Sequence, residues 1–120
     1  VKKILTSNVA TSAENALIVS FTKLVKCGWE HLDNSTIMLL RLLDGLGVSS
    51  INIAGFDGYN YNGDGTLNYV NKFLELSNVK DNPIELNEEI SAMLEDFMQS
   101  KISTTPIQFI TPSRFEIIME

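Results

Sequence analysis

The stretch 34–59, which reads NSTIMLLRLLDGLGVSSINIAGFDGY, decides the fold that we expect. Asn34 or Ser35 is suited to cap a helix, and the leucine-rich run that follows supplies its apolar faces. Gly47 is the residue type that ends a helix in the left-handed conformation. The apolar residues of segment 50–55 then predict a short buried strand. The stretch is therefore a helix-to-strand unit of the kind from which α/β proteins are built.

A polar, glycine-rich loop follows that strand, and α/β proteins usually place ligands where parallel strands end. We expect Thr111, which follows the last predicted strand, to lie at the same edge. The start of the helix should aim free backbone N–H groups towards an anionic ligand there. The candidate ligand-binding residues are Asn8, Asn34, Ser35, Gly55, Asp57 and Tyr59.

The remaining elements extend this unit. We expect strands at about 2–6, 16–21, 50–55 and 107–110, and helices at about 34–46 and 87–101. The second strand is almost continuously apolar, which predicts burial on both faces. The order of elements predicts a single α/β domain over 1–120, with a small, mostly parallel sheet of about four strands and helices on its faces, as a Rossmann-like three-layer sandwich.

Composition and charge exclude several classes of function. The chain has 120 residues, of which 44% are hydrophobic, so it has the composition of a folded protein. Its net charge of −6 and its lack of a basic cluster argue against nucleic acid or an anionic membrane as partner. The one cysteine, Cys27, has no partner for a disulfide or a zinc site. We expect a cytoplasmic protein, since no signal peptide or membrane span is apparent.

Several candidate residues have two interpretations. The Asp57 carboxylate could accept hydrogen bonds from a ribose or sugar hydroxyl, or it could stabilise its own turn. Tyr59 could stack on the ring of a ligand or cover the edge of the sheet. His31 could be a general base or a surface or capping residue. Its pairing with Cys27 lacks an orienting third group, and we set that dyad aside.

The segment 60–71 imitates a calcium loop, with Asn60, Asn62 and Asp64 at alternating positions and a glycine after them. The imitation fails at its twelfth position, which is Asn71 where such loops carry a glutamate. Only one carboxylate is present, so a glycine-rich turn is the better interpretation.

Five short motifs together resemble the C-terminal domain that follows the barrel in aldolases of the 4-hydroxy-2-oxovalerate aldolase type, a family of metal-dependent pyruvate lyases. The resemblance spans nearly the whole chain. The motifs are Thr6-Ser-Asn-Val, Asp33-Asn34, Leu46-Gly47-Val, Ile53-Ala-Gly-Phe-Asp-Gly-Tyr59 and Phe109-Ile-Thr-Pro-Ser113.

That resemblance implies a division of labour. In the family, an N-terminal (β/α)₈ barrel holds the divalent metal and carries out the carbon–carbon bond chemistry. This sequence has none of the barrel's Asp-Arg-Glu or His-x-His ligand motifs, so we expect no cofactor and no lyase activity in the fragment alone. Its partner would be the barrel of the same chain. The absence of an initiating Met before Val1 agrees with a piece of a longer protein.

A second, narrower resemblance covers 34–57. The residues Asn34-Ser35-Thr36, Leu46-Gly47, Ile53, Gly55 and Asp57 are similar to the Thr-Ser-Gly, Leu-Gly and Gly-x-Asp pattern of bacterial sialyltransferases, which have Rossmann-like domains. The resemblance implies that Ser35, Gly55 and Asp57 line a nucleotide-sugar site. Thr36 stands where the pattern has glycine, and no histidine follows the Gly-x-Asp loop as a base.

The sequence therefore predicts an accessory domain of an aldolase-like lyase, with a nucleotide-sugar-binding transferase domain as the alternative. A third interpretation is an interaction module that forms a homo-oligomer or orients the barrel. Such a module would show a flat apolar surface in place of a cleft.

Overall fold

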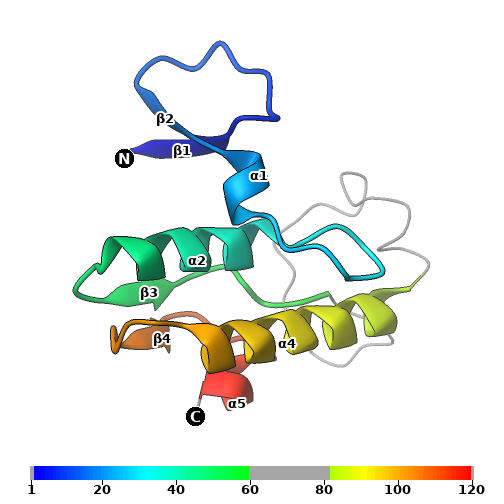
Figure 1. Ribbon diagram of the computed structural model, residues 1–120. Coiled ribbons are helices and arrows are strands. Elements are labelled where there is room, and N and C mark those ends of the chain that lie inside the picture. Colours follow the sequence, from blue (N-terminus) through cyan, green and yellow to red (C-terminus); the bar gives the residue numbers. More distant parts are fainter. Residues whose placement is uncertain (1, 60–81, 120) are drawn as a thin grey trace.

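The computed structural model describes residues 2–59 and 82–119, which form a mixed arrangement of helices and parallel strands (Figure 1). None of the helices in these two ranges has both the length and the apolar character that crossing a lipid bilayer requires. The elements are β1 (Lys3–Thr6), β2 (Ala16–Val19), α1 (Phe21–Leu24), α2 (Ser35–Leu46), β3 (Ile51–Ile53), α4 (Pro83–Ser100), β4 (Ile107–Phe109) and α5 (Glu116–Met119).

The four strands of the described residues form two separate parallel pairs. β1 pairs with β2 in the register Lys3 to Ala16, and β3 pairs with β4 in the register Ile51 to Ile107. The parallel direction agrees with the sequence prediction, but a single four-stranded sheet is not seen. Helix α2 lies between the two pairs in Figure 1, so its two faces meet different strands.

The boundaries of α2 follow from two residues. Asn34 is the N-cap, and its Oδ1 accepts hydrogen bonds from the N–H groups of Thr36 and Ile37 at 2.9 and 3.3 Å. Gly47 ends the helix with φ 64° and ψ 43°, a conformation that costs glycine no steric strain. Both predictions are confirmed.

The β1–β2 pair lies outside the hydrophobic core. Leu17 and Ile18 of β2 are 58% and 56% exposed, so the prediction that this strand is buried on both faces is wrong. The link between the two strands, 7–15, contains no helix that could cover the outer face. Among the described elements, α1 and α2 lie against the pair, and they cover one side.

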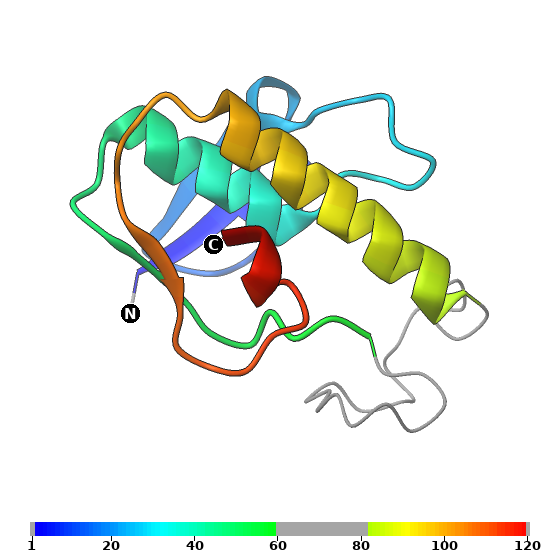
Figure 2. The same ribbon diagram turned by 90° about the horizontal axis from the view of Figure 1, so that it is seen from below.

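The core forms where α2, β3 and α4 meet, and Figure 2 shows α4 crossing α2 with α5 beside it. Phe56 lies between two other rings, with centroids 6.4 Å from Phe109 and 4.9 Å from Phe115. The buried members of this core are Ile37, Leu40, Ile51, Ile53, Phe56, Ile90, Met93, Leu94, Phe97 and Phe115. Trp29 packs against this core.

Helix α4 begins earlier than predicted. We expected the helix to start at Asn87, but Pro83 is the first helical residue. Proline suits that position because its missing N–H would have no helical partner there and its φ is already helical. Asn87 and Glu89 therefore lie beyond the first turn of the helix, and their side chains reach other segments.

A buried aspartate joins α2 to the segment that leads into β4. Asp44 is 8% exposed, and its carboxylate accepts hydrogen bonds from the N–H groups of Ile102 and Ser103 at 2.8 and 2.9 Å. The Ser103 hydroxyl and these backbone donors lower the pKa of Asp44, against the opposing effect of its burial. The carboxylate therefore fixes the backbone at Ile102 and Ser103, where the chain leaves α4 and leads into β4.

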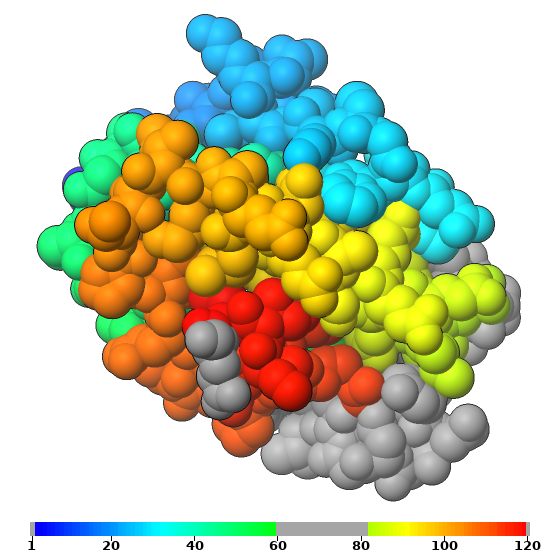
Figure 3. Space-filling view, turned by 60° about the horizontal axis from the view of Figure 1, so that its bottom comes forward, coloured from blue at the N-terminus to red at the C-terminus, as the bar shows by residue number. Residues whose placement is uncertain are grey.

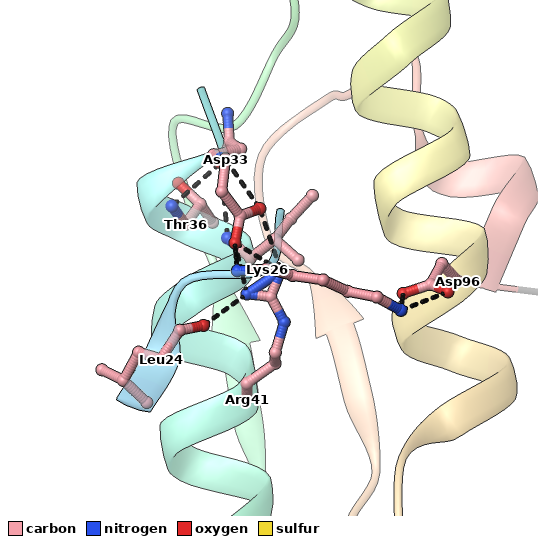
Figure 4. Close-up of polar contacts among 8 residues, drawn as sticks. Leu24, Lys26, Asp33, Thr36, Arg41 and Asp96 are labelled. Atoms are coloured by element: carbon pink, nitrogen blue, oxygen red, sulfur yellow. Dashed lines mark hydrogen bonds and ion pairs between the residues drawn. The ribbon is translucent and has the colours of Figure 1, made fainter. Parts of the chain in front are cut away.

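The segment 25–34, which connects α1 to α2, is held by a buried ion pair. The guanidinium of Arg41 on α2 binds the Asp33 carboxylate through both of its terminal nitrogens, with N–O distances of 2.7 and 2.9 Å (Figure 4). The Asp33 side chain is fully buried, and it also accepts a hydrogen bond from the Lys26 N–H. Arg41 further donates to the Leu24 carbonyl. One charged pair thus ties both ends of the segment to α2.

The same segment is joined to α4 at the surface. Lys26 Nζ lies 2.6 Å from an oxygen of Asp96, but the two side chains are 45% and 33% exposed (Figure 4). The space-filling view shows the segment lying along one side of α4 (Figure 3). An exposed pair of this kind is screened by solvent, so we expect it to contribute much less than the Asp33–Arg41 pair.

We predict that Arg41→Ala lowers the free energy of unfolding by about 3 kcal/mol, because it leaves the buried Asp33 charge without its partner. Lys26→Ala is the matched control and should cost less than about 1 kcal/mol. Urea denaturation followed by circular dichroism measures both. Equal losses in the two variants would contradict this account.

Candidate functional site

A cavity of about 550 Å³ opens between the segment that precedes α2, Tyr59 in the loop after β3, and the first half of α4. Its floor is apolar and is formed by Leu86, Ile90 and Met93 of α4. Residues 30–35 and Tyr59 form the rest of its lining, together with Glu89. A concave site with an apolar floor and a few polar groups is the usual form of a small-molecule site.

The lining of this cavity includes a pair formed by His31 and Glu89. His31 Nδ1 lies 2.6 Å from Glu89 Oε2, and the two side chains are only 26% and 15% exposed. A carboxylate accepts hydrogen bonds and does not donate them, so Nδ1 carries the proton. Among the described residues Nε2 has no hydrogen-bond partner. The pair therefore leaves an available nitrogen on a residue that lines the cavity.

Glu89 also fixes the backbone that carries the histidine. Its carboxylate accepts hydrogen bonds from the N–H groups of Glu30 and His31. Burial raises the pKa of Glu89, but the hydrogen bonds from the His31 ring and from both N–H groups outweigh it, so the pKa is lowered overall. Glu89 is consequently ionised at neutral pH and holds the ring in one orientation.

Asn87 performs the corresponding task for Tyr59. Its Oδ1 accepts a hydrogen bond from the Tyr59 N–H and its Nδ2 donates one to the Tyr59 carbonyl, both at 2.8 Å. Asn87 lies on α4 and is buried from solvent. Because the Asn87 amide bonds both the N–H and the carbonyl of Tyr59, it fixes the Tyr59 backbone beside the cavity.

Three of the predicted site residues meet in this cavity. Asn34, Ser35 and Tyr59 all line it. The Asn34 side chain, however, already satisfies the N–H groups of Thr36 and Ile37, so these donors are not free for an anionic ligand. The lining also carries the acidic residues Glu30, Asp33 and Glu89 and, in its described part, no lysine or arginine.

Gly55 and Asp57 lie near each other but outside the lining of this cavity. The Gly55 N–H donates a hydrogen bond to Thr111 Oγ1 at 2.9 Å, so the predicted approach of the loops after β3 and β4 is confirmed. The Arg114 N–H donates to the Asp57 carbonyl in the same region. Asn8 is exposed in the turn after β1, and it is not among the residues that line the cavity.

The Asp57 carboxyl group is in an unusual environment. It is 7% exposed, and among the described residues its Oδ1 has no hydrogen-bond partner. Burial raises its pKa. If Asp57 stabilised its own turn by accepting from the Tyr59 N–H, that N–H would point at its carboxylate. The Tyr59 N–H instead donates to Asn87 Oδ1. Contact between Asp57 and a ligand stays a prediction.

A second cavity of about 350 Å³ lies on the other face of α2, beneath the β1–β2 pair. Its lining is mostly aliphatic and includes Leu5, Val9, Met38 and Leu42. Ser35 borders both cavities, because it is the first residue of α2. The described part of its lining carries no charged side chain that could serve as an acid or a base.

The calcium-like segment 60–71 and Tyr61 lie outside the described residues. In the ranges that the structure describes, no group of three or more His, Cys, Asp or Glu side chains is placed to hold a metal ion. Cys27 is exposed and is not among the residues that line the cavity.

Comparison with known proteins gives no relative. No protein-family model matches the chain, and no curated protein and no solved structure matches it either.

Sequence analysis missed Glu89 and Asn87 and gave little weight to His31. A signal for Asn87 was present, because it lies on the apolar stripe of α4, three residues before Ile90 and seven before Leu94. A polar residue at such a position must find a partner. The pairing of Glu89 with His31 has no local signal, since 58 residues separate them.

We predict that Asp57→Asn raises the melting temperature at neutral pH, because it removes a buried charge that lacks a hydrogen bond at Oδ1. The raised pKa of Asp57 penalises the folded state once the pH exceeds the pKa of the unfolded chain, so the gain should disappear in acid. Asp44→Asn is the matched control, since that carboxylate is equally buried but receives two backbone N–H groups.

The control should have the opposite sign. The lowered pKa of Asp44 stabilises the fold above the unfolded pKa and is lost as the pH falls through the folded value. Asp44→Asn should therefore lower the melting temperature at pH 7 and have less effect in acid. Thermal melts at both pH values measure this, and shifts of the same sign in the two variants would refute it.

Proposed function

We propose that this chain is a ligand-binding accessory domain of an aldolase-like lyase and that its ligand occupies the cavity of about 550 Å³ beside His31. In this proposal an N-terminal barrel of the same chain holds the divalent metal and cleaves the carbon–carbon bond, in the cytoplasm. The sequence resemblance supports the parentage. The cavity, with its ordered His31–Glu89 pair, supports ligand binding and is the observation that carries this part of the proposal.

The charges of the lining favour an uncharged ligand. Glu30, Asp33 and Glu89 contribute carboxylates, of which Asp33 is paired with Arg41, and the described lining has no lysine or arginine to balance a phosphate or carboxylate of the ligand. Moving an anion next to these groups would be unfavourable in a partly desolvated site. The apolar floor and the Tyr59 side chain suit a small molecule with an apolar body or the face of a sugar ring.

A nucleotide-sugar-binding domain is the alternative. It is favoured by the placement of Asn34, Ser35 and Tyr59 around one cavity, since the sialyltransferase resemblance puts the helix start at the ligand. This alternative expects a Rossmann-like sheet of about four strands; the parallel direction of both strand pairs fits it, but the strands form two separate pairs. The carboxylates of the lining and the Asn34 cap weigh against a diphosphate. Assembly into a homo-oligomer is compatible with either proposal.

Saturation-transfer NMR with uncharged sugars, small aromatic ketones and uridine diphosphate sugars tests the proposal. We expect at least one uncharged compound to bind wild type and to bind Tyr59→Ala more weakly, because the ring that lines the cavity is lost. Ile110→Ala, which changes an exposed residue outside the lining, is the control and should leave binding unchanged.

Two results would decide against the proposal. Binding of uridine diphosphate sugars alone, weakened by Ser35→Ala, would establish the alternative in its place. No binding by any member of the panel would overturn both. Metal-binding barrel motifs in the coding sequence before Val1 would support the lyase parentage, and a different preceding domain would remove it.

A further inference from the structure

We propose that His31 and Glu89 form a general acid–base pair, in which His31 Nε2 activates a water molecule for hydrolysis of a small uncharged ester bound in the cavity. The inference rests on the proposed ligand cavity, and it adds an activity to it. Glu89 is the positioning residue and His31 the catalytic residue.

The orientation of the imidazole carries the first step of the argument. The Nδ1–H bond to Glu89, at 2.6 Å, fixes the ring, and the two backbone hydrogen bonds to the same carboxylate fix the segment that bears it. A histidine whose Nδ1 is held by an ionised carboxylate has Nε2 available as a proton acceptor. The arrangement repeats the base and orienting group of hydrolytic sites, which are recognised by geometry and not by sequence position.

The position of the pair carries the second step. Both residues line the cavity of about 550 Å³, so a bound molecule lies within reach of the imidazole. Leu86, Ile90 and Met93 provide the apolar floor, and the neighbouring carboxylates of Glu30 and Glu89 disfavour an anionic substrate. An uncharged acyl compound satisfies both conditions. Holding the backbone needs only the Nδ1 bond to Glu89, so it does not explain why His31 lines the cavity with Nε2 unbonded among the described residues.

The chemistry uses only water and the ester. Nε2 takes a proton from water while the water oxygen forms a bond to the acyl carbon, and Glu89 stabilises the imidazolium that results. The bond between the acyl carbon and the alcohol oxygen then breaks, and the imidazolium returns its proton to the leaving alkoxide. The products are a carboxylic acid and an alcohol, and no oxidant, reductant or metal takes part.

Hydrolysis of p-nitrophenyl acetate by the purified chain, followed as release of p-nitrophenol, tests the inference. Because His31 is the sole histidine of the sequence, His31→Gln removes all imidazole catalysis. The glutamine amide can still donate a hydrogen bond to Glu89, so the fold should be retained, and circular dichroism and the melting temperature check this. We expect kcat/KM to fall about tenfold or more in His31→Gln.

Glu89→Gln tests the positioning role. It should lower kcat and leave KM unchanged, since it alters the orientation and stabilisation of the imidazole and not the apolar floor. Glu95→Gln, on an exposed position of the same helix outside the lining, is the matched control and should behave as wild type. A purely structural role for Glu89 would instead appear as a loss of stability with an unchanged kcat of the folded fraction.

Binding of 4-nitroacetophenone, an unreactive ketone analogue, separates this inference from the proposed function. If the ketone binds in the cavity but His31→Gln lowers ester hydrolysis by less than tenfold, the acid–base pair is refuted and the ligand site stands. If the ketone does not bind and the ester is not hydrolysed above the His31→Gln rate, both fail. Ketone binding with histidine-dependent hydrolysis is the result that we predict.

Discussion

The ion pair between Asp33 and Arg41 is the interaction on which the rest of the site depends. It places a fully buried carboxylate against a guanidinium, and the Lys26 N–H and the Leu24 carbonyl at the end of α1 add hydrogen bonds to the pair. Such a pair is costly to bury and costly to break, because removing one partner leaves a charge in a low-dielectric environment. Its main consequence is that it fixes the position of the segment that carries His31 relative to α2.

The functional site is then assembled from residues that are distant in the sequence. With the segment fixed to α2, Glu89 of α4 reaches His31, and Asn87 of the same helix holds Tyr59. The apolar stripe of α4 packs on the core and sets the distance between these groups. The cavity is therefore the space left between a helix face held by hydrophobic packing and a segment held by electrostatics. The carboxylates of its lining support our proposal of an uncharged ligand.

Local signals predicted the two long helices, α2 and α4, but missed the short helices α1 and α5 and could not predict long-range pairing. Asn34 and Gly47 identified the ends of α2 because caps depend on residues within one turn. The separation of the strands into two pairs, and the exposed face of β2, depend on where α2 packs, which no local pattern encodes. For the site, proximity of Gly55 to Thr111 followed from parallel strands ending together, whereas Asn8 belongs to the other strand pair. The pairing of His31 with Glu89 required the tertiary fold.

The central claim is that Glu89 holds His31 with Nδ1 protonated, so that Nε2 is available to the cavity. Two-bond ¹H–¹⁵N NMR correlations of the sole histidine report its tautomer directly at a pH where the ring is neutral. The account predicts a protonated Nδ1 and an unprotonated Nε2 in wild type, and loss of this preference in Glu89→Gln. A ring protonated at Nε2 in the folded wild-type chain would contradict it.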